Sequence, residues 1–233
     1  MSEPVSRGDT TNFILKRLSD SDFALLQPHL EATRLPVRKM LEPRKRKIKN
    51  VYFMESGFAS VVANGSGQDI EVGIIGREGM TGIAVVMNAD RPVHETYIQV
   101  AGDGFSLSAD SLRQAIDKSV SLHRELLKSA YAFQTQVTQT ALANGRSKIE
   151  ERLCRWLLMA DDRIDGDELP LTHEFLSFML GVQRSGVTLA LQRLERDGLI
   201  RARRANITII DRRAMEKKSN GAYSPQKLSL IHI

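Results

Sequence analysis

One stretch near the C-terminal end restricts the fold of this chain more than any other. Residues 172–200 read "THEFLSFMLGVQRSGVTLALQRLERDGLI", with apolar side chains three and four positions apart on both sides of Gly181. Thr172 is a favourable N-cap for a first helix, and Gly181 can adopt the left-handed conformation that ends it. A second helix begins within a few residues and stops at Gly198. Two short helices joined by a tight glycine turn form a helix-turn-helix arrangement.

The second of these helices has two different faces. Its apolar face contains Val187, Ala190, Leu191 and Leu194; its opposite face contains Ser185, Thr188, Leu189, Gln192 and Arg196, with Arg184 and Arg193 beside it. The first two turns contain no acid, whereas a solvated helix face usually mixes both charges. Gln183, Arg184 and Thr188 carry donors that suit base edges and phosphates, and Leu189 can contact a thymine methyl group. The pattern therefore predicts a helix that reads DNA; the alternative is an amphipathic helix that only packs on a core.

A basic hairpin is predicted directly after the second helix. The segment "LIRARRANITIID" indicates a strand over residues 199–202, a basic turn over 203–206 and a second strand over 207–210. A basic hairpin in this place is the wing of a winged-helix domain. Arg203 and Arg204 are expected to contact backbone phosphates, which adds affinity more than specificity.

A long helix is predicted upstream, from Lys118 to Ala143. Side chains at heptad spacing form a seam typical of a coiled coil, namely Val120, His123, Leu127, Ala130, Gln134, Val137 and Ala141. A neighbouring stripe of Leu122, Leu126 and Phe133 can pack on the chain's own core. The alternative is a helix buried within one subunit, but two stripes on one helix favour a homodimer. Asn144-Gly145 is expected to end this helix and to form a hinge.

The N-terminal half predicts helices followed by a β-rich region. Residues 12–30 show helical spacing, with "SDSD" as a cap between two apolar clusters. From about residue 35 to 107, short pieces such as "NVYFMESG", "DIEVGIIG" and "ETYIQVAG" alternate with glycine turns, as in a β-sandwich or barrel. We therefore expect an α+β protein with a β-sandwich or barrel domain over 1–116, a dimerisation helix over 117–143 and a winged helix-turn-helix domain over 144–221; the resemblance described below implies that the first domain is a β-roll or jelly roll.

Composition excludes several classes of protein. With 42% hydrophobic and 26% charged residues, the chain is typical of a globular protein, and no apolar run approaches the ~20 residues of a membrane span. The start of the chain has no apolar signal-peptide core, and the single cysteine, Cys154, excludes an internal disulfide and a multi-cysteine metal site. These features predict a cytoplasmic protein without a membrane partner. The net charge of +5 permits a polyanionic partner.

Enzyme chemistry finds no support in the sequence. A cupin-type metal oxygenase would need clustered histidines and a carboxylate, but His94 is the only histidine in the β-rich region. No nucleophile motif or phosphate-binding loop is present either, since "GREG" is too short and lacks a following lysine. We therefore predict that the chain is not an enzyme and has no cofactor. A haem bound by His94 or Cys154 is an open alternative, although a lone histidine is more often structural.

Over residues 12–223 the chain resembles the Crp/Fnr family of bacterial transcription regulators. The resemblance rests on "VYFMESGFASVV", "EVGIIGREGMTG", "KIEERLCRWLLMADDR", "DELPLTHEFLSFMLGVQRSGVTLALQRLERDGLI" and "ITIIDR". It implies a β-roll of the cyclic-nucleotide-binding type, a dimer helix, a winged helix and a homodimer on a roughly palindromic operator in double-stranded DNA. It further implies that Arg184, Ser185 and Leu189 read bases and that Thr172 and His173 meet phosphate.

The sequence departs from this family at the nucleotide pocket. Cyclic-nucleotide sensors of the family carry a glycine–glutamate pair and, after a loop, an arginine followed by serine or threonine. Here Ile83 stands near the glutamate position, "PVHETYIQV" offers no arginine, and Arg91 falls in the turn "NADRP". Without a placed cation a cyclic phosphate would be poorly held. Control by cyclic AMP is therefore not expected, and the effector at the β-roll, the operator and the choice between activation and repression stay open.

A second basic cluster lies in "RKMLEPRKRKIKN", with Arg38, Lys39, Arg44, Lys45, Arg46, Lys47 and Lys49. The favoured interpretation is a solvated hairpin. The alternatives are a site for an anionic effector and a contact with RNA polymerase or flanking DNA.

The last six residues, 228–233, read "LSLIHI". They match the translation of CTG-TCT-CTT-ATA-CAC-ATC, which resembles the transposon end used in sequencing-library adapters. We interpret them as an adapter artefact and exclude them from the fold; the alternative is an apolar tail that docks on the domain.

Overall fold

The computed structural model describes residues 5–64, 69–203 and 206–224. The described chain divides into two compact units, and each is treated by itself. The first unit comprises residues 5–61 and 73–135, and the second comprises 62–64, 69–72 and 136–224. The predicted adapter-derived residues 228–233 lie outside the described residues.

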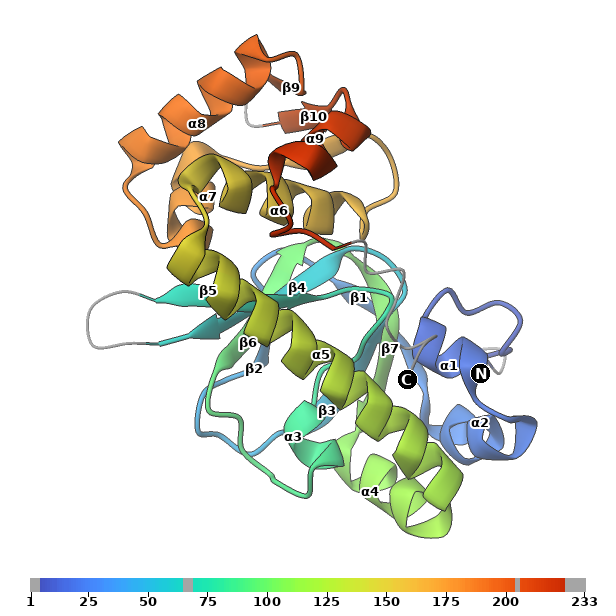
Figure 1. Ribbon diagram of the computed structural model, residues 1–233. Helices are drawn as coiled ribbons and strands as arrows, with labels where there is room; N and C mark the ends of the chain where they lie inside the picture. Colours follow the sequence, from blue (N-terminus) through green and yellow to red (C-terminus); the bar gives the residue numbers. More distant parts are fainter. Residues whose placement is uncertain (1–4, 65–68, 204–205, 225–233) are drawn as a thin grey trace. The chain divides into compact units, whose positions relative to one another are not determined.

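The helices and strands follow the predicted order (Figure 1). The helices are α1 (Phe13–Arg17), α2 (Asp20–Leu26), the 3-10 helix η1 (Gln27–His29), α3 (Ile83–Val86), α4 (Ala109–Lys118), α5 (Val120–Arg146), α6 (Ile149–Asp161), α7 (His173–Leu180), α8 (Arg184–Arg196) and α9 (Arg212–Lys218). The strands are β1 (Glu31–Leu35), β2 (Met40–Glu42), β3 (Asn50–Met54), β4 (Phe58–Ala63), β5 (Ile70–Ile75), β6 (Glu95–Val100), β7 (Gly102–Ser108), β8 (Glu168–Pro170), β9 (Ile200–Arg203) and β10 (Asn206–Ile209). The α+β class is confirmed.

Two sheets form the β-rich region. One has the strand order β1-β7-β3 and the other β2-β6-β4-β5. Strand β7 pairs antiparallel with both of its neighbours, and its buried Leu107 lies opposite Val51 of β3. In the second sheet β2 pairs antiparallel with β6, with a register shift between Met40 and Glu42. Turns such as Gly57, whose φ of 64° favours glycine, separate the strands where the sequence predicts breaks.

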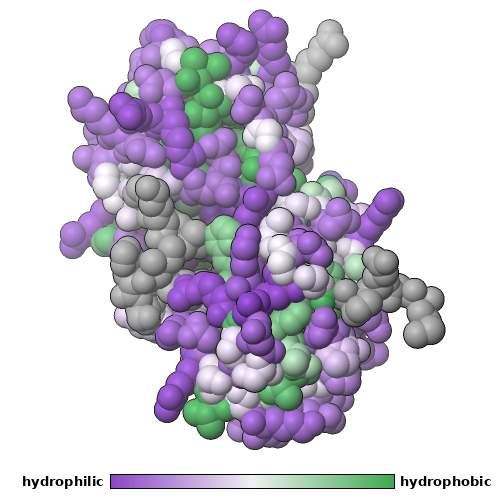
Figure 2. All heavy atoms as spheres, turned by 90° about the vertical axis from the view of Figure 1, so that its right-hand side faces the viewer, coloured by the Kyte–Doolittle hydropathy of each residue, from purple (hydrophilic) through white to green (hydrophobic). Residues whose placement is uncertain are grey.

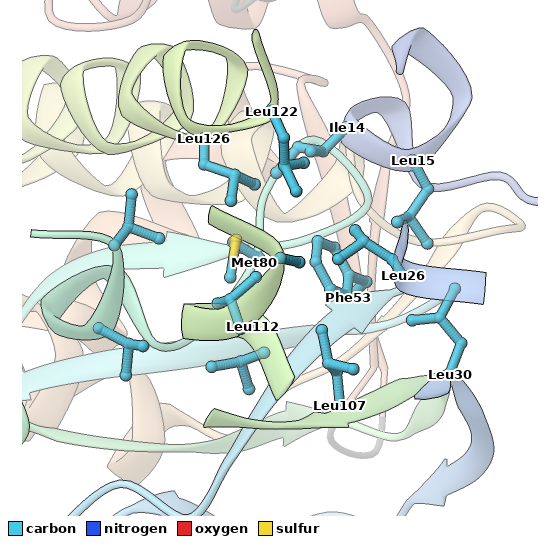
Figure 3. Close-up of a cluster of buried hydrophobic side chains, with 14 of the residues drawn as sticks. Ile14, Leu15, Leu26, Leu30, Phe53, Met80, Leu107, Leu112, Leu122 and Leu126 are labelled. Atoms are coloured by element: carbon cyan, nitrogen blue, oxygen red, sulfur yellow. The ribbon is translucent and has the colours of Figure 1, made fainter. Parts of the chain in front are cut away.

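An apolar cluster lies in the core of the first unit (Figure 3). It gathers side chains from α1, α2, the strands, α4 and the first turns of α5. Phe53 and Met80 are buried near its middle, and Leu122 and Leu126 point into it from α5. The predicted inner stripe of the long helix is therefore confirmed for these two leucines. Most side chains on the face drawn in Figure 2 are hydrophilic, as expected for a chain with 26% charged residues.

The long helix differs from its prediction at both ends. Ser119 is not helical and separates α5 from α4, and its hydroxyl accepts a hydrogen bond from Leu122 N at 3.2 Å. At the other end Asn144-Gly145 does not stop the helix, which continues to Arg146. Glycine is tolerated there because a helix interior asks only for ordinary helical angles, and the cost of about 1 kcal/mol is small in a helix of 27 residues. The break comes at 147–148, where Glu151 accepts from Lys148 N at 2.8 Å and caps α6.

The second unit contains three helices against a small sheet, followed by α9. The sheet has the order β8-β10-β9, and β10 pairs antiparallel with both neighbours. Strand β8 forms within "DGDELP", a segment whose acidic residues and glycine favour a loop. It forms because Leu169 is fully buried opposite Ile207, and this burial outweighs the polar residues around it. The core comprises Leu153, Leu157, Leu176, Val187, Leu191, Leu194, Ile207 and Met215.

Candidate nucleic-acid interface

The turn between α7 and α8 has the predicted geometry. The Thr172 hydroxyl accepts from Phe175 N at 3.1 Å and caps α7. Gly181 has a φ of 60°, and its N–H donates to the Phe178 carbonyl at 3.1 Å, while Val182 N donates to the Ser177 carbonyl. These bonds satisfy carbonyls that the end of a helix leaves open. The chain can therefore reverse within three residues and begin α8 at Arg184.

Helix α8 presents the two faces that the sequence predicts. Val187, Ala190, Leu191 and Leu194 are buried. On the outer face, Gln183, Arg184, Ser185 and Gln192 are exposed, and Leu189 is 55% exposed. An apolar side chain that is this exposed does not pack in the core, so its methyl groups can contact a partner molecule. Gly186 lies on the inner side, where an added Cβ would come within 3.3 Å of Ile149 Cδ1, so it permits close packing of α8 on α6.

Thr188 and His173 form a bonded pair beside this face. His173 Nδ1 lies 3.0 Å from Thr188 Oγ1, and Thr188 Oγ1 lies 3.0 Å from the Arg184 carbonyl oxygen. Both side chains are half-buried. The predicted phosphate contact at the start of α7 and the predicted donor on α8 are thus joined to each other, which the sequence spacing did not indicate.

The acidic residues at the end of α8 have partners within the second unit. Glu195 accepts from Ala202 N at 3.1 Å, and Asp197 pairs with Lys218 at 2.8 Å. The pKa of the Asp197 carboxyl is lowered, first by its hydrogen bond from Lys218. Arg193, a predicted DNA contact, pairs with Glu150 of α6 although its side chain is 58% exposed. Its guanidinium would have to share its donors between Glu150 and a phosphate.

The wing places basic side chains at the end of β9. Arg203 is exposed and lies opposite Asn206 of β10 in the register. Arg204 lies outside the described residues. Arg201 is exposed as well, and its side chain shares one face of the strand with Arg203 because strand side chains alternate. Arg201 was missed in the sequence, where the two-residue spacing in "RARR" would have found it.

Two arginines of α6 donate hydrogen bonds to other segments of the second unit, and neither role was predicted from the sequence. Arg152 donates to the Leu180 carbonyl at the end of α7. Arg155 is buried and donates to the Ala222 carbonyl at 3.0 Å and to the Thr140 hydroxyl at 3.1 Å. Burial lowers the pKa of Arg155 to about 10. Only the tertiary structure gives these roles, since an arginine in an amphipathic helix ordinarily faces water.

Some residues of the predicted dimer seam of α5 are exposed in the single chain, whereas others face inward. Val120 is 68% exposed and Leu127 is 41% exposed; Gln134 and Ala141 are exposed, and Val137 is half-buried. His123 and Ala130 face inward: His123 Nε2 lies 3.0 Å from the Val86 carbonyl oxygen, and Ala130 is buried. Two residues outside the predicted set, Tyr131 and Leu142, are 56% and 49% exposed. The exposed apolar stripe of α5 therefore runs through Val120, Leu127, Tyr131 and Leu142.

A buried carboxylate lies in the β-rich region, near the positions where the sequence departs from the family's nucleotide-binding residues. Glu42 of β2 accepts from Gly82 N, and its second oxygen lies 3.5 Å from Thr96 Oγ1. Burial raises the pKa of Glu42, although these hydrogen bonds oppose the shift. Ile83, which stands near the family's glutamate position, is half-buried in α3, and Arg91 is an exposed turn residue paired with Asp90 at 3.7 Å. A side chain of the protein itself thus engages the Gly82 backbone donor.

The basic cluster 38–49 lies on the turns on either side of strand β2, and most of its side chains are exposed. Strand β2 pairs with β6 and not with β1 or β3, so the segment does not form the predicted hairpin. Lys45 N donates to the Pro92 carbonyl at 2.9 Å and Ile48 N to the Asp90 carbonyl at 2.8 Å, so this turn is bonded to the turn at 88–92. A shallow hollow of about 460 Å³ lies there, lined by Lys47, Asn88, Ala89, Asp90, Arg91 and Arg113. Three cationic side chains and one carboxylate therefore line this hollow.

The two residues considered as haem ligands lie in different surroundings. His94 is half-buried, and burial lowers its pKa. Cys154 is buried in α6 with its Sγ 3.7 Å from Met215 Sδ, and burial raises its pKa to about 12. Across residues 5–64, 69–203 and 206–224, no three histidine, cysteine or carboxylate side chains are placed to hold a metal ion. No helix in those ranges is both long and apolar enough to cross a membrane.

Comparisons with known proteins agree with this geometry. Residues 151–218 match the sequence profile of the Crp-like helix-turn-helix domain. A comparison with curated proteins found no match. Among solved structures, a putative Crp/Fnr regulator from Eubacterium rectale aligns with a TM-score of 0.70 at 16% identity, covering 91% of this chain and 99% of that one.

Two further solved structures are similar at the same identity of 16%. FixK2 from Bradyrhizobium japonicum aligns with a TM-score of 0.69 and covers 81% of this chain and 96% of its own. The c-di-GMP responsive global regulator CLP from Xanthomonas campestris aligns with a TM-score of 0.67, over 83% of this chain and 100% of its own. Residues 151–218 therefore form a Crp-like helix-turn-helix domain, and the chain has the fold of the Crp/Fnr transcription regulators.

Proposed function

We propose that this chain is a homodimeric, sequence-specific DNA-binding transcription regulator of the Crp/Fnr type that acts in the bacterial cytoplasm and is not an enzyme. The observation that carries the proposal is the outer face of α8. Arg184, Ser185 and Leu189 are exposed there without an acid in the first two turns, and the basic strand β9 follows at once. A helix of this kind fits the major groove of double-stranded DNA.

The two parts of the interface divide the work of recognition. Arg184, Ser185 and Leu189 would contact base edges, with Gln183 at the start of the helix. Thr172 and His173 at the start of α7, together with Arg203 and Arg204 of the wing, would contact phosphates and fix the register. Arg193 would be a weaker phosphate contact, because Glu150 already holds its guanidinium.

A second copy of the chain is the partner that we assign to α5. The exposed stripe through Val120, Leu127 and Tyr131 would pair with its symmetry mate, which explains apolar side chains facing water in the single chain. A twofold dimer reads a roughly palindromic operator whose half-sites lie about one helical turn, ~34 Å, apart.

Regulation is assigned to the β-roll, with an effector other than cyclic AMP. Support comes from Ile83, which stands near the position of the family's glutamate, and from the absence of an arginine in "PVHETYIQV". In addition, the Glu42 carboxylate accepts the hydrogen bond that the Gly82 backbone N–H donates. RNA polymerase is the expected protein partner of an activator. The second candidate function is an interaction or sensor module that does not bind DNA; the exposed Arg184 and Arg203 disfavour it.

Binding to duplexes selected in vitro from a random pool tests the proposal. Enrichment should yield one motif with twofold symmetry, and the logarithm of the association constant should fall linearly with the logarithm of the salt concentration. Each phosphate contact contributes about −0.9 to that slope, because each contact releases condensed counterions. If no duplex bound at low salt, the module that does not bind DNA would become the better description.

A further inference from the structure

Three segments of the first unit meet at the shallow hollow beside the turn at 88–92, and each contributes a cation. Lys47 comes from the turn before β3, Arg91 from the turn that follows α3, and Arg113 from α4. The hollow has a volume of about 460 Å³, within the ~300–1,000 Å³ of pockets that hold small ligands. Like charges repel, so three cations around one space favour an anionic occupant.

The turn on one side of the hollow is fixed by the end of α3. Asn88 has a φ of 61°, in the left-handed region that asparagine tolerates. Its N–H donates to the Val85 carbonyl at 3.1 Å. Ala89 N donates to the Ala84 carbonyl at 2.7 Å, and the two bonds together form the Schellman arrangement that closes a helix. The turn therefore keeps one backbone shape without a ligand.

Two further hydrogen bonds join this turn to the basic turn before β3. Lys45 N donates to the Pro92 carbonyl at 2.9 Å, and Ile48 N donates to the Asp90 carbonyl at 2.8 Å. Lys47 lies between the two donating residues, so its backbone is held against the neighbouring turn. A ligand in the hollow meets groups whose backbone is already in place, which lowers the entropic cost of binding.

The charges around the hollow are only partly neutralised. Asp90, the carboxylate of the lining, lies 3.7 Å from Arg91, and both side chains are more than half exposed. Arg113 pairs at 3.0 Å with Asp110, which lies outside the lining and is 74% exposed. Exposed pairs of this kind contribute little to stability and can exchange partners. Within the described residues, the exposed Lys47 side chain has no hydrogen bond or ion pair.

The electrostatic field near the hollow is positive. Arg44, Arg46 and Lys49 are exposed on the same segment as Lys47. Burial lowers the pKa of His94 first, and the charge of Arg44 lowers it further, as a positive field does to a histidine. The same field attracts an anion from solution.

A phosphomonoester fits the charge and the size of this hollow. Three cations and one carboxylate leave a net charge of +2 in the lining, and a phosphomonoester carries about −1.5 to −2 at pH 7. Guanidinium groups offer paired donors for phosphate oxygens, and a lysine adds a point charge. The Asn88 amide and the Asp90 carboxylate can bond hydroxyl groups of the remaining ligand. A long polyanion fits less well, because the lining is concave and includes a carboxylate.

Both helices beside the hollow lead to α5. His123 of α5 has its Nε2 3.0 Å from the Val86 carbonyl oxygen at the end of α3. Helix α4, which carries Arg113, packs against α3 and is separated from α5 by Ser119 alone (Figure 1). A ligand that bridges Arg91 and Arg113 therefore ties together two elements that hold the start of α5.

We propose that this hollow binds a phosphomonoester of a small hydroxylated molecule and that this ligand is the effector, a role that rests on the proposed DNA-binding function. Lys47, Arg91 and Arg113 hold the phosphoryl group, and Asn88 and Asp90 bind hydroxyl groups. Occupation of the hollow ties α3 to α4, restricts the start of α5 and thereby changes the affinity of the dimer for DNA.

Isothermal titration calorimetry of the full-length protein with ribose 5-phosphate tests the site without DNA. One molecule should bind per chain, and free ribose should not bind at the same concentrations. Inorganic phosphate, which lacks the hydroxylated part, and citrate, whose charge lies on carboxylates, should bind more weakly at equal ionic strength. Because the proposed DNA face is cationic as well, the assignment to the hollow depends on the difference between the wild type and its variants.

Two variants remove charge from the hollow, and one control removes the same charge beside it. Lys47→Gln and Arg113→Gln should each raise the dissociation constant of ribose 5-phosphate by about tenfold, because each removes a charge-assisted hydrogen bond. Arg46→Gln changes an exposed cation of the same turn that lies outside the lining. It should change the dissociation constant by less than about twofold. Lys47 is exposed, so its replacement leaves the fold intact.

The calorimetry decides the site by itself. Equal affinities of the wild type and Lys47→Gln would overturn it, and so would binding of citrate as tight as that of ribose 5-phosphate. Inorganic phosphate bound as tightly as ribose 5-phosphate would assign the hollow to free phosphate and overturn the phosphomonoester.

Fluorescence anisotropy with the selected duplex, with and without saturating ribose 5-phosphate, tests the effector role. The duplex affinity of the wild type should change by at least about fivefold, and that of Lys47→Gln should change much less. An unchanged affinity in the wild type would overturn the effector role. If no duplex bound under any condition, the proposed DNA-binding function would fail, while the calorimetry would still decide whether the hollow binds the ligand.

Discussion

At the scale of single residues, the proposed division between base reading and phosphate binding rests on Arg184 and Arg203. Both side chains are exposed, and they come from different elements, α8 and β9. Arg184→Ala should cost ~1–3 kcal/mol on the selected motif and relax the preference at one position of each half-site. Arg203→Ala should weaken all sequences alike and lower the salt slope by about one per arginine removed.

Competition binding against a panel of single-base variants measures both effects. Lys217→Ala, an exposed change on α9 outside the proposed interface, is the control for the loss of one positive charge. A uniform loss of affinity in both arginine variants would show that Arg184 does not read bases.

Glu42 makes a second prediction at this scale, for the stability of the β-roll. The pKa of Glu42 is raised in the folded protein, so ionisation of this carboxyl opposes folding. The protonated group makes its full contribution to the free energy of unfolding at pH values below the pKa of the unfolded state. That contribution is lost as the pH rises through the pKa of the folded state. Glu42→Gln imitates the protonated form. It should raise the unfolding midpoint at pH 7–8, by about 4 °C if ~1 kcal/mol is gained, and the gain should shrink toward pH 4.

Thermal scans followed by circular dichroism check this at each pH. Glu31→Gln, an exposed glutamate on β1, is the matched control and should stay within ±0.5 kcal/mol, roughly, of the wild type. A lower midpoint for Glu42→Gln at pH 8 would mean that the carboxylate charge itself stabilises the pocket.

At the scale of elements, two glycines of similar appearance in the sequence act in opposite ways. Gly145 lies inside α5, and an added Cβ there meets nothing within 4 Å. Gly198 ends α8 with a φ of 72°, again with open space around a Cβ. Gly145→Ala should stabilise the protein by ~0.5–1 kcal/mol, whereas Gly198→Ala should cost ~1–2 kcal/mol because of the left-handed backbone.

Urea unfolding of the two variants separates these cases. Both changes add one methyl group to a surface with room for it, so they differ only in the backbone angle. Equal shifts in the two variants would contradict the helix boundary at Arg146.

Some of the helices, caps and strands could be predicted from local sequence patterns, and others could not. The caps Thr172 and Gly181 and the wing were predictable because their bonds join residues a few positions apart. Helix α5 was predicted, but its end was not, because Asn144-Gly145 is a weak stop when the next cap lies at Lys148. Strand β8 was not predicted because its partner β10 lies more than thirty residues further along the chain.

At the scale of the whole molecule, α5 contributes to the core of the subunit and also carries the exposed apolar stripe that we propose contacts a second copy. Leu122 and Leu127 are five residues apart on it, yet Leu122 is fully buried and Leu127 is 41% exposed. Leu122→Ala should cost ~2–5 kcal/mol of folding free energy, the range for a leucine lost from a core. Leu127→Ala should change subunit stability by less than about 1 kcal/mol and raise the dimer dissociation constant.

Sedimentation equilibrium and urea unfolding measure the two quantities on the same samples. Because a dimer is also stabilised by mass action, unfolding is compared at a fixed protein concentration. If Leu127→Ala left the dissociation constant unchanged, the exposed stripe of α5 would not be the dimer contact.

The sequence by itself determined the order of the main parts of the chain, the helix-turn-helix with its wing and the polar face of α8. These depend on local periodicity, capping and turn chemistry, which act over a few residues. Only the tertiary structure decided that His173 bonds to Thr188, that Glu42 engages Gly82, that Glu150 holds Arg193, and that His123 and Ala130 face inward. Those contacts join residues from separate elements. Packing between elements selects which face of each helix is buried, and no single stretch of sequence specifies that choice.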